Sequence, residues 1–142
     1  MTYSNLIPIK FKDKQIIIDC VIYGINSTNF RSISLVLDTG ATISGISENV
    51  AVELGYDPSQ FDRFEEFATA GGTQKLPMVT VSQIDIAGSK YKDFTLLCNR
   101  YFDDNYIDGV LGLDFLINYD ILINFTDGYI QITERENYII TP

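Results

Sequence analysis

The sequence contains no histidine, and only two of its 142 residues are cysteines. Without histidine, Ser-His and Cys-His catalysis are excluded, and so are metal sites with histidine ligands. Cys20 and Cys98 each lie inside an apolar run, where a free thiol behaves as a small buried hydrophobic side chain. A disulfide between them is left open but is not indicated. Side-chain catalysis is thereby narrowed to carboxylates.

Basic residues and long hydrophobic runs are also scarce. Ten Lys and Arg are scattered from Lys10 to Arg135 against 19 Asp and Glu, which gives a formal net charge of -9. Such a surface repels phosphate backbones, so we expect no nucleic-acid partner. No stretch approaches the roughly 18 apolar residues of a membrane span, and the N-terminus does not resemble a signal peptide. We therefore expect a soluble, cytoplasmic protein with no membrane partner.

What is present is the composition of a globular domain. Hydrophobic residues make up 46% of the sequence and charged residues 20%, a balance too apolar for disorder. The length fits one domain that can bury a core, and no linker or change in composition marks a boundary. We expect a single domain over residues 1–142.

Most segments are short apolar runs bounded by turn residues, which is typical of a mostly β protein. Residues 6–11 and 15–23 predict one hairpin, and two further hairpins are predicted by residues 78–86 with 91–98 and by residues 120–125 with 129–133. Residues 31–37 predict a strand, whose unbroken Ile-Ser-Leu-Val-Leu indicates burial on both faces. This strand leads directly into Asp38.

A helix is predicted shortly after Asp38. Ser47 is a good N-cap for residues 48–54, and Gly55 stands where a left-handed residue ends a helix. The helix would follow the strand-end carboxylate directly.

Asp38, Thr39 and Gly40 form the motif that carries chemistry. The tripeptide alone is weak evidence for catalysis, because Asp and Gly often occupy turns for reasons of backbone geometry. The phosphate-handling loops of actin-like ATPases use a similar motif, but in much longer α/β chains. Peptide hydrolysis by carboxylates needs two of them: one draws a proton from water while the other donates to the scissile carbonyl. The chain has one such motif, and a two-fold homodimer would supply the second carboxylate.

The order of motifs resembles the retropepsin-like aspartic proteases, which are single-domain homodimers related to pepsin. Residues 35–44 resemble the catalytic loop, and residues 47–55 resemble the helix that follows it in the cellular branch. Residues 67–77 resemble the flap, a Gly-tipped hairpin that closes over bound peptide, and residues 107–116 resemble the strand and short helix beneath the loop. The likeness is greatest to the protease domain of DNA-damage-inducible ubiquitin-shuttle proteins.

The resemblance implies a fold and a set of residue roles. The fold would be a mostly β closed barrel, equivalent to half of pepsin, with a second short helix near residues 113–117. Asp38 would be the acid/base, Thr39 would grip its symmetry mate, and Gly40 would permit close approach. The implied substrate-binding residues are Ala41 in the loop, Ala70, Gly71 and Gly72 in the flap, and Val110 and Leu111 beneath the loop.

Two departures from the family pattern affect these expectations. Retroviral members often carry an acidic residue at the position of Thr42 and an Arg at the position of Leu113, and these two groups form an ion pair near the dimer axis. Both are missing here, so no unpaired buried charge is left, and the dimer contact would depend on apolar terminal strands. Pepsin has a hydroxyl residue at Ala41 that hydrogen-bonds the catalytic carboxylate, which lowers a carboxylate's pKa. Without it we expect a less acidic activity optimum than pepsin's.

The resulting hypothesis is a homodimeric aspartic endopeptidase that acts on an extended polypeptide and needs no metal or organic cofactor. The rival is a non-catalytic retropepsin-like module that dimerises or binds a peptide without cutting it. Asp108, Asp114 and Asp120 are candidate metal ligands, but their spacing matches no familiar ligand motif. Solvated turns and a helix N-terminus explain them better.

Overall fold

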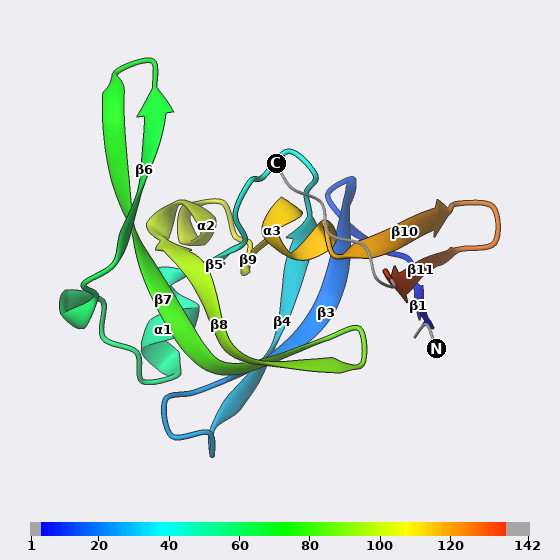
Figure 1. Ribbon diagram of the computed structural model, residues 1–142, viewed down its shortest axis with the longest axis horizontal. Coiled ribbons are helices and arrows are strands. Elements are labelled where there is room, and N and C mark those ends of the chain that lie inside the picture. The colour runs from blue at the N-terminus through cyan, green and yellow to red at the C-terminus, as the bar shows by residue number, and fades with distance from the viewer. Residues whose placement is uncertain (1–3, 136–142) are drawn as a thin grey trace.

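The structure is a computed structural model that describes residues 4–135. Within this range the protein consists mainly of β-strands with a few short helices, which confirms the predicted class (Figure 1). The strands are β1 (Ser4–Pro8), β2 (Lys10–Lys12), β3 (Gln15–Tyr23), β4 (Phe30–Leu37), β5 (Gly45–Ser47), β6 (Phe64–Thr69), β7 (Gly72–Ile86), β8 (Ser89–Asn99), β9 (Gly109–Leu111), β10 (Tyr119–Asn124) and β11 (Tyr129–Glu134). The helices are α1 (Glu48–Glu53), the 3-10 helix η1 (Pro58–Gln60), α2 (Arg100–Asp104) and α3 (Leu113–Leu116).

The strands form two sheets. A small antiparallel sheet has the order β1-β11-β10, and the other strands follow the order β2-β3-β4-β9-β5-β8-β7-β6. Strand β3 also pairs with β7, with Cys20 opposite Ile86 and Ile22 opposite Ile84. This pairing closes β3, β4, β9, β5, β8 and β7 into a ring, in keeping with the closed arrangement that the sequence predicted.

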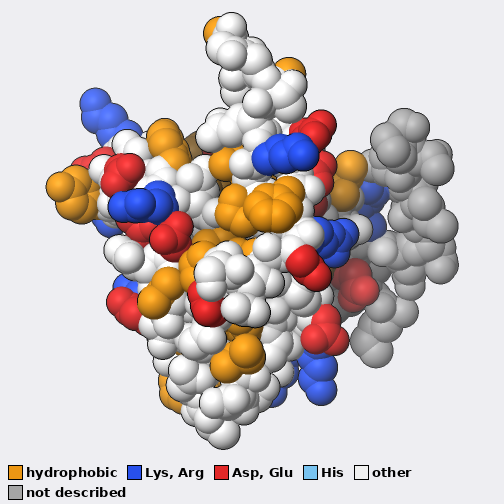
Figure 2. All heavy atoms as spheres, turned by 90° about the vertical axis from the view of Figure 1, so that its left-hand side faces the viewer, with side chains coloured by type: hydrophobic (Ala, Val, Ile, Leu, Met, Phe, Trp, Pro, Cys, Tyr) orange, Lys and Arg blue, Asp and Glu red, His pale blue; other side chains and the backbone are white. Residues whose placement is uncertain are grey.

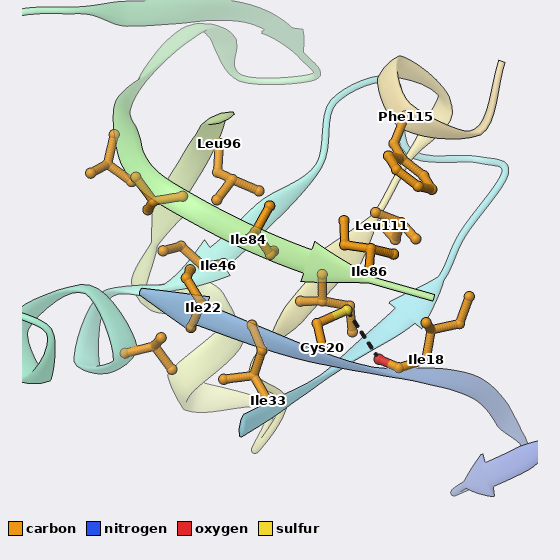
Figure 3. Packing of buried hydrophobic residues seen from close by; sticks show 14 of the residues in the cluster. Ile18, Cys20, Ile22, Ile33, Ile46, Ile84, Ile86, Leu96, Leu111 and Phe115 are labelled. Atoms are coloured by element: carbon orange, nitrogen blue, oxygen red, sulfur yellow. Dashed lines mark hydrogen bonds between the residues drawn. The ribbon is translucent and has the colours of Figure 1, made fainter. Parts of the chain in front are cut away.

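The core fills the inside of this ring. Successive side chains of a strand point to opposite faces, and on β3 the inward set Ile18, Cys20 and Ile22 is at most 3% exposed. Leu111 of β9 and Phe115 of α3 lie in the same buried cluster (Figure 3). The elements around the candidate catalytic loop are therefore anchored in the main core.

The predicted helices are confirmed. The Ser47 hydroxyl accepts a hydrogen bond from Val50 N at 3.1 Å to cap α1, and Gly55 has a φ of +91°, as a helix stop requires. Helix α2 was not predicted, although Asn99 caps it by accepting from Tyr101 N. Among the described residues, no helix is both long and apolar enough to cross a membrane.

The predicted hairpin of residues 6–11 with 15–23 is wrong in its first half. The run divides at Ile9: β1 pairs with β11, and only Lys10–Lys12 pairs with β3. Pro8 has no N–H to continue a ladder, and it stands opposite Tyr129 at the end of β1. One apolar run therefore serves two sheets.

The other two predicted hairpins are confirmed. Strand β7 turns into β8 through Ala87 and Gly88, which both have positive φ, as a two-residue type I′ turn requires. Strand β10 pairs with β11 from Tyr119 opposite Glu134 to Asn124 opposite Tyr129. Strand β7 is longer than predicted, because it continues without a break from the flap into the core.

Candidate active site

Asp38 lies at the end of β4, where the chain leaves the sheet. Strand β4 runs parallel to β9, and Asp38 N donates to Leu111 O at 3.0 Å just beyond the last paired residues. Gly40 N donates to the Asp38 carboxylate at 2.8 Å, and Ala41 N donates to Asp38 O at 3.2 Å. The Asp38 side chain is half-buried, while Thr39 and Gly40 are exposed. The carboxylate is thus oriented by the backbone N–H of Gly40 at an open surface.

The chain from Ala41 to Ser44 is tied to the segment that follows β9. Leu113 N donates to Ala41 O at 2.8 Å, and Asp114 N donates to Thr42 O at 3.2 Å. We refer to residues 38–44 as the catalytic loop. Both halves of this loop are therefore attached to the β9–α3 segment.

Ser44 and Asp114 form the side-chain part of this attachment. The Ser44 hydroxyl donates to Asp114 Oδ1 at 2.7 Å and accepts from Gly112 N at 2.8 Å. Ser44 N also donates to the Asp114 carboxylate, at 3.0 and 3.1 Å to its two oxygens, and Phe115 N donates to Asp114 Oδ1 at 2.9 Å. Ser44 is 0% exposed. Its hydroxyl is satisfied as both donor and acceptor, as a buried polar group requires.

Two glycines allow the backbones to approach this closely. A Cβ on Gly112 would lie 2.6 Å from Ala41 O, and a Cβ on Gly109 would lie 2.0 Å from Gly45 O. Real Cβ atoms do not approach backbone oxygens so closely, so a larger residue would push the catalytic loop or β5 away. The sequence Val110-Leu111-Gly112 thus reflects the close packing of two backbones as well as the strand β9.

The flap is the hairpin of β6 with the start of β7. Thr69 pairs with Gly72, so Ala70 and Gly71 form the turn, and the Thr69 hydroxyl donates to Gly72 O at 2.7 Å. Gly72 has a φ of +120°, and added Cβ atoms on Gly71 and Gly72 would meet nothing within 4 Å. The hairpin projects from the body, and apolar side chains gather on the surface below it (Figure 2).

The structure brings one group of predicted site residues together and leaves the other apart. Asp38, Thr39, Gly40 and Ala41 form the loop that rests on Leu111. Val110 is half-buried between β4 and β5, opposite Val36 and Gly45. Ala70, Gly71 and Gly72 form the flap tip, which shares no hydrogen bond with the catalytic loop in the described part of the chain.

The predicted departures at Thr42 and Leu113 are visible in the geometry. Both residues are exposed, and only their backbones take part in holding the loop. In this chain the polar side-chain link between the loop and α3 is made by Ser44 and Asp114. An ion pair between positions 42 and 113 is thus not needed to attach the loop.

Sequence reasoning missed Ser44 and explained Asp114 only as a residue at a helix N-terminus. Asp114 does lie in the first turn of α3, but its carboxylate also binds a residue 70 positions away. No local pattern connects two positions that far apart. The available signal was weak: a serine shortly after a candidate catalytic motif and an aspartate beside a close-approach glycine.

The remaining polar and reactive groups lie outside the site. Cys20 and Cys98 are free and buried, and burial raises the pKa of each thiol to about 12. Within residues 4–135, no three carboxylate or thiol side chains are grouped so that they could hold a metal ion. A cavity of about 650 Å³ contains none of the predicted site residues; it is lined by Asn5, Leu6, Ile7, Asp19, Cys20, Val21, Ser32, Ile33, Ser34, Asp85, Ala87 and Gly88.

Comparisons with known proteins agree with this geometry. A family model described as "gag-polyprotein putative aspartyl protease" matches residues 25–118, a range that contains the catalytic loop, the flap and β9. A search of curated proteins found no match. Among solved structures, the chain is similar to a retropepsin-like aspartic protease from Rickettsia conorii, with 20% identity, a TM-score of 0.69 and 94% of each chain covered.

At 20% identity the structural likeness establishes the fold alone. The finer likeness to the DNA-damage-inducible proteins is not tested by these comparisons and stays a prediction. The family is shown by the sequence match, which covers most of the chain. The chain therefore belongs to the gag-polyprotein aspartyl protease family and has the retropepsin-like fold.

Proposed function

We propose that the protein is a homodimeric aspartic endopeptidase in which two copies of Asp38, one from each subunit, activate one water. The observation that carries this proposal is the Asp38 carboxylate itself, presented at the end of a core strand and oriented by the Gly40 N–H at 2.8 Å. Thr39 and Gly40 are exposed beside it and available for a contact across a two-fold axis. Family membership supports the same chemistry.

In the proposed reaction the two carboxylates share one proton. The ionised carboxylate takes a proton from water as the water oxygen attacks the scissile carbonyl, and the protonated carboxyl gives its proton to the carbonyl oxygen. The tetrahedral intermediate then collapses and the C–N bond breaks: the carboxyl that took the water proton gives it to the leaving amine, and a hydroxyl of the intermediate returns its proton to the other carboxylate, which restores the shared proton. No metal or organic cofactor is required by these steps.

The flap would close over an extended peptide. Ala70, Gly71 and Gly72 present exposed backbone groups, which can pair with a peptide in the manner of an added strand. Ala41 and Val110, which are half-buried, would form the apolar part of the binding surface near the loop, and the fully buried Leu111 would support them from beneath. We further propose a cytoplasmic location, supported by two buried cysteines that remain free thiols.

The absence of a hydroxyl at Ala41 motivates a proposal on pH dependence. Among the described residues, the Gly40 N–H donates a hydrogen bond to the Asp38 carboxylate. The Ala41 side chain cannot donate a second one. We expect an activity optimum less acidic than pepsin's, and Ala41→Ser should move the optimum toward lower pH. A wild-type pH–rate profile with its maximum near pH 2 would contradict this proposal.

The decisive experiment compares three proteins on a peptide library. The wild type and an Asp13→Asn control, which removes a charge at the β2–β3 turn, should cleave peptides, and Asp38→Asn should not. Sedimentation should show that all three are dimers. Dimers that cut nothing in any form would favour the rival binding module, and a strictly monomeric wild type would remove the second carboxylate and with it the mechanism.

A further inference from the structure

We propose that Ser44 and Asp114 act as a positioning pair, which holds the catalytic loop so that the Asp38 carboxylate keeps its catalytic orientation. The role in catalysis rests on the proposed function. The role in holding the loop rests on the geometry of the chain alone.

The pair acts beside the two backbone attachments of the loop, at Asp38 and at Ala41. Leu111 O accepts from Asp38 N, and Leu113 N donates to Ala41 O. Gly112 lies between these two anchors, and its N–H donates to the Ser44 hydroxyl at 2.8 Å. The Ser44 hydroxyl therefore fixes the residue that joins both attachments.

Asp114 fixes Ser44 in turn. Its carboxylate accepts from both the hydroxyl and the N–H of Ser44, so the serine rotamer and backbone are held together. Hydrogen bonds to an ionised acceptor are the stronger kind, and Ser44 is fully buried, where water cannot replace a lost partner. Removal of either side chain would leave buried donors or acceptors without partners.

The consequence for catalysis follows from what orients Asp38. Its carboxylate accepts from Gly40 N, and Gly40 lies in the middle of the loop, between the two attachments. Loosening the attachments moves Gly40, and with it the direction of the carboxylate. The substrate-binding flap is carried by a separate hairpin and would be unaffected. Loss of the pair should therefore lower kcat more than it raises KM.

The test compares Ser44→Ala with a matched control, Ser47→Ala, in the full-length protein. Ser47 is also a buried serine, at 3% exposure, and its hydroxyl caps α1 by accepting from Val50 N. We expect Ser44→Ala to lower kcat about tenfold to a hundredfold and to raise KM by less, since small misplacements of a catalytic group have effects of this order. Ser47→Ala should destabilise the protein but keep the wild-type kcat.

Asp114 supplies a graded series. Asp114→Ala should match Ser44→Ala, whereas Asp114→Asn keeps a carbonyl acceptor for Ser44 and should recover a large part of kcat. The asparagine variant also keeps the site measurable if the alanine variants fold poorly. Equal kcat values for Asp114→Ala, Asp114→Asn and the wild type would overturn the proposal.

A readout that does not need activity is the hydrogen exchange of the Gly40 amide, followed by NMR. Ser44→Ala should speed this exchange about tenfold or more relative to Ser47→Ala, because the loop opens more easily. Equal exchange in the two variants would overturn the proposal. If the wild type cleaves no peptide, the proposed function fails, and the Gly40 exchange still decides whether the pair holds the loop.

Discussion

The catalytic loop and the flap carry the two groups of predicted site residues, yet they are built in opposite ways. The loop is held by backbone bonds to Leu111 and Leu113 and by the hydrogen bonds between the buried Ser44 and Asp114. The flap is an exposed two-stranded ribbon with open space around its tip, where a Cβ added at Gly71 or Gly72 would meet no atom within 4 Å. One region is anchored in the core, and the other is joined to it mainly through β7.

This difference matches what a peptidase would need from each region. A carboxylate that polarises water must be held in place before the substrate arrives. A hairpin that admits and covers a peptide must move, and exposed elements with few buried contacts open most easily. Substitutions in each region can test this division of roles.

The largest expected difference between the core and the flap is in the rate at which cysteine thiols are alkylated. Burial raises the pKa of Cys20 and Cys98 to about 12, and the thiolate is the form that reacts. At about pH 8 these thiols should be alkylated about a thousandfold more slowly than a cysteine placed at the flap tip by Ala70→Cys. Mass spectrometry of the labelled native protein measures the rates. Comparable labelling rates for all three cysteines would contradict the burial of Cys20 and Cys98 in the core.

Loss of apolar volume should lower the free energy of unfolding strongly beneath the loop and only slightly on the flap. Leu111 is 0% exposed, so Leu111→Ala should reduce the free energy of unfolding by about 2–5 kcal/mol. Phe64 at the base of the flap is 53% exposed, so Phe64→Ala should cost about 1 kcal/mol or less. Urea unfolding of both variants measures the difference, and equal losses would show that the flap is as tightly packed as β9.

Glycine substitutions sharpen the same contrast. In Gly112→Ala the new Cβ would lie 2.6 Å from Ala41 O, and forcing it in should cost about 1–3 kcal/mol and lower activity. Gly71→Ala meets nothing within 4 Å and should leave stability unchanged or raise it by up to about 1 kcal/mol. Thermal unfolding of the two variants compares them. Destabilisation by Gly71→Ala would show that the flap tip is packed.

The smallest effect concerns exposed ion pairs. The Lys10 ammonium that hydrogen-bonds Asp19 holds the pKa of that carboxyl below its ordinary value, against a smaller opposing effect of burial. The stabilisation is therefore present above the ordinary pKa of 3.8 and is lost as the pH falls through the lower folded-state value.

Asp19→Asn should cost less than about 1 kcal/mol near neutral pH, because the Asp19 side chain is 52% exposed and screened by solvent. The difference from the wild type should shrink at acidic pH, as the pH falls below 3.8 and through the lower folded-state pKa, because the carboxyl then becomes protonated in both states. On the flap, Glu66 lies 3.6 Å from Lys75 with 62% of its side chain exposed, and Glu66→Gln should have no measurable effect. Urea unfolding at both pH values checks these expectations.

Elements with a local signal were predictable. The strand that ends at Asp38, the Ser47 cap of α1, the turn at Gly88 and the Gly-tipped flap each depend on residues within a few positions of one another. Helix α2 was missed because it is short. The helix also makes a tertiary contact: its Asp103 carboxylate accepts hydrogen bonds from Glu48 N and Asn49 N at the start of α1.

The division of residues 6–11 between two sheets shows a different limit. The apolar alternation continues through the run, but β1 finds its partner in β11, at the far end of the chain. Periodicity states which face of a strand is buried, and it does not state which strand lies beside it. Pro8 was a local sign of a break, whereas the choice of partner was not local.

The sequence by itself determined that the chain is a mostly β domain, that a carboxylate stands at the end of a buried strand, and that histidine takes no part in its chemistry. Only the tertiary structure decided how that carboxylate is held, through a Ser44–Asp114 link across 70 positions and the β3–β7 pairing that closes the ring. Local propensities depend on neighbouring residues. Contacts between distant residues form only when the whole chain packs, and so leave no pattern along the sequence.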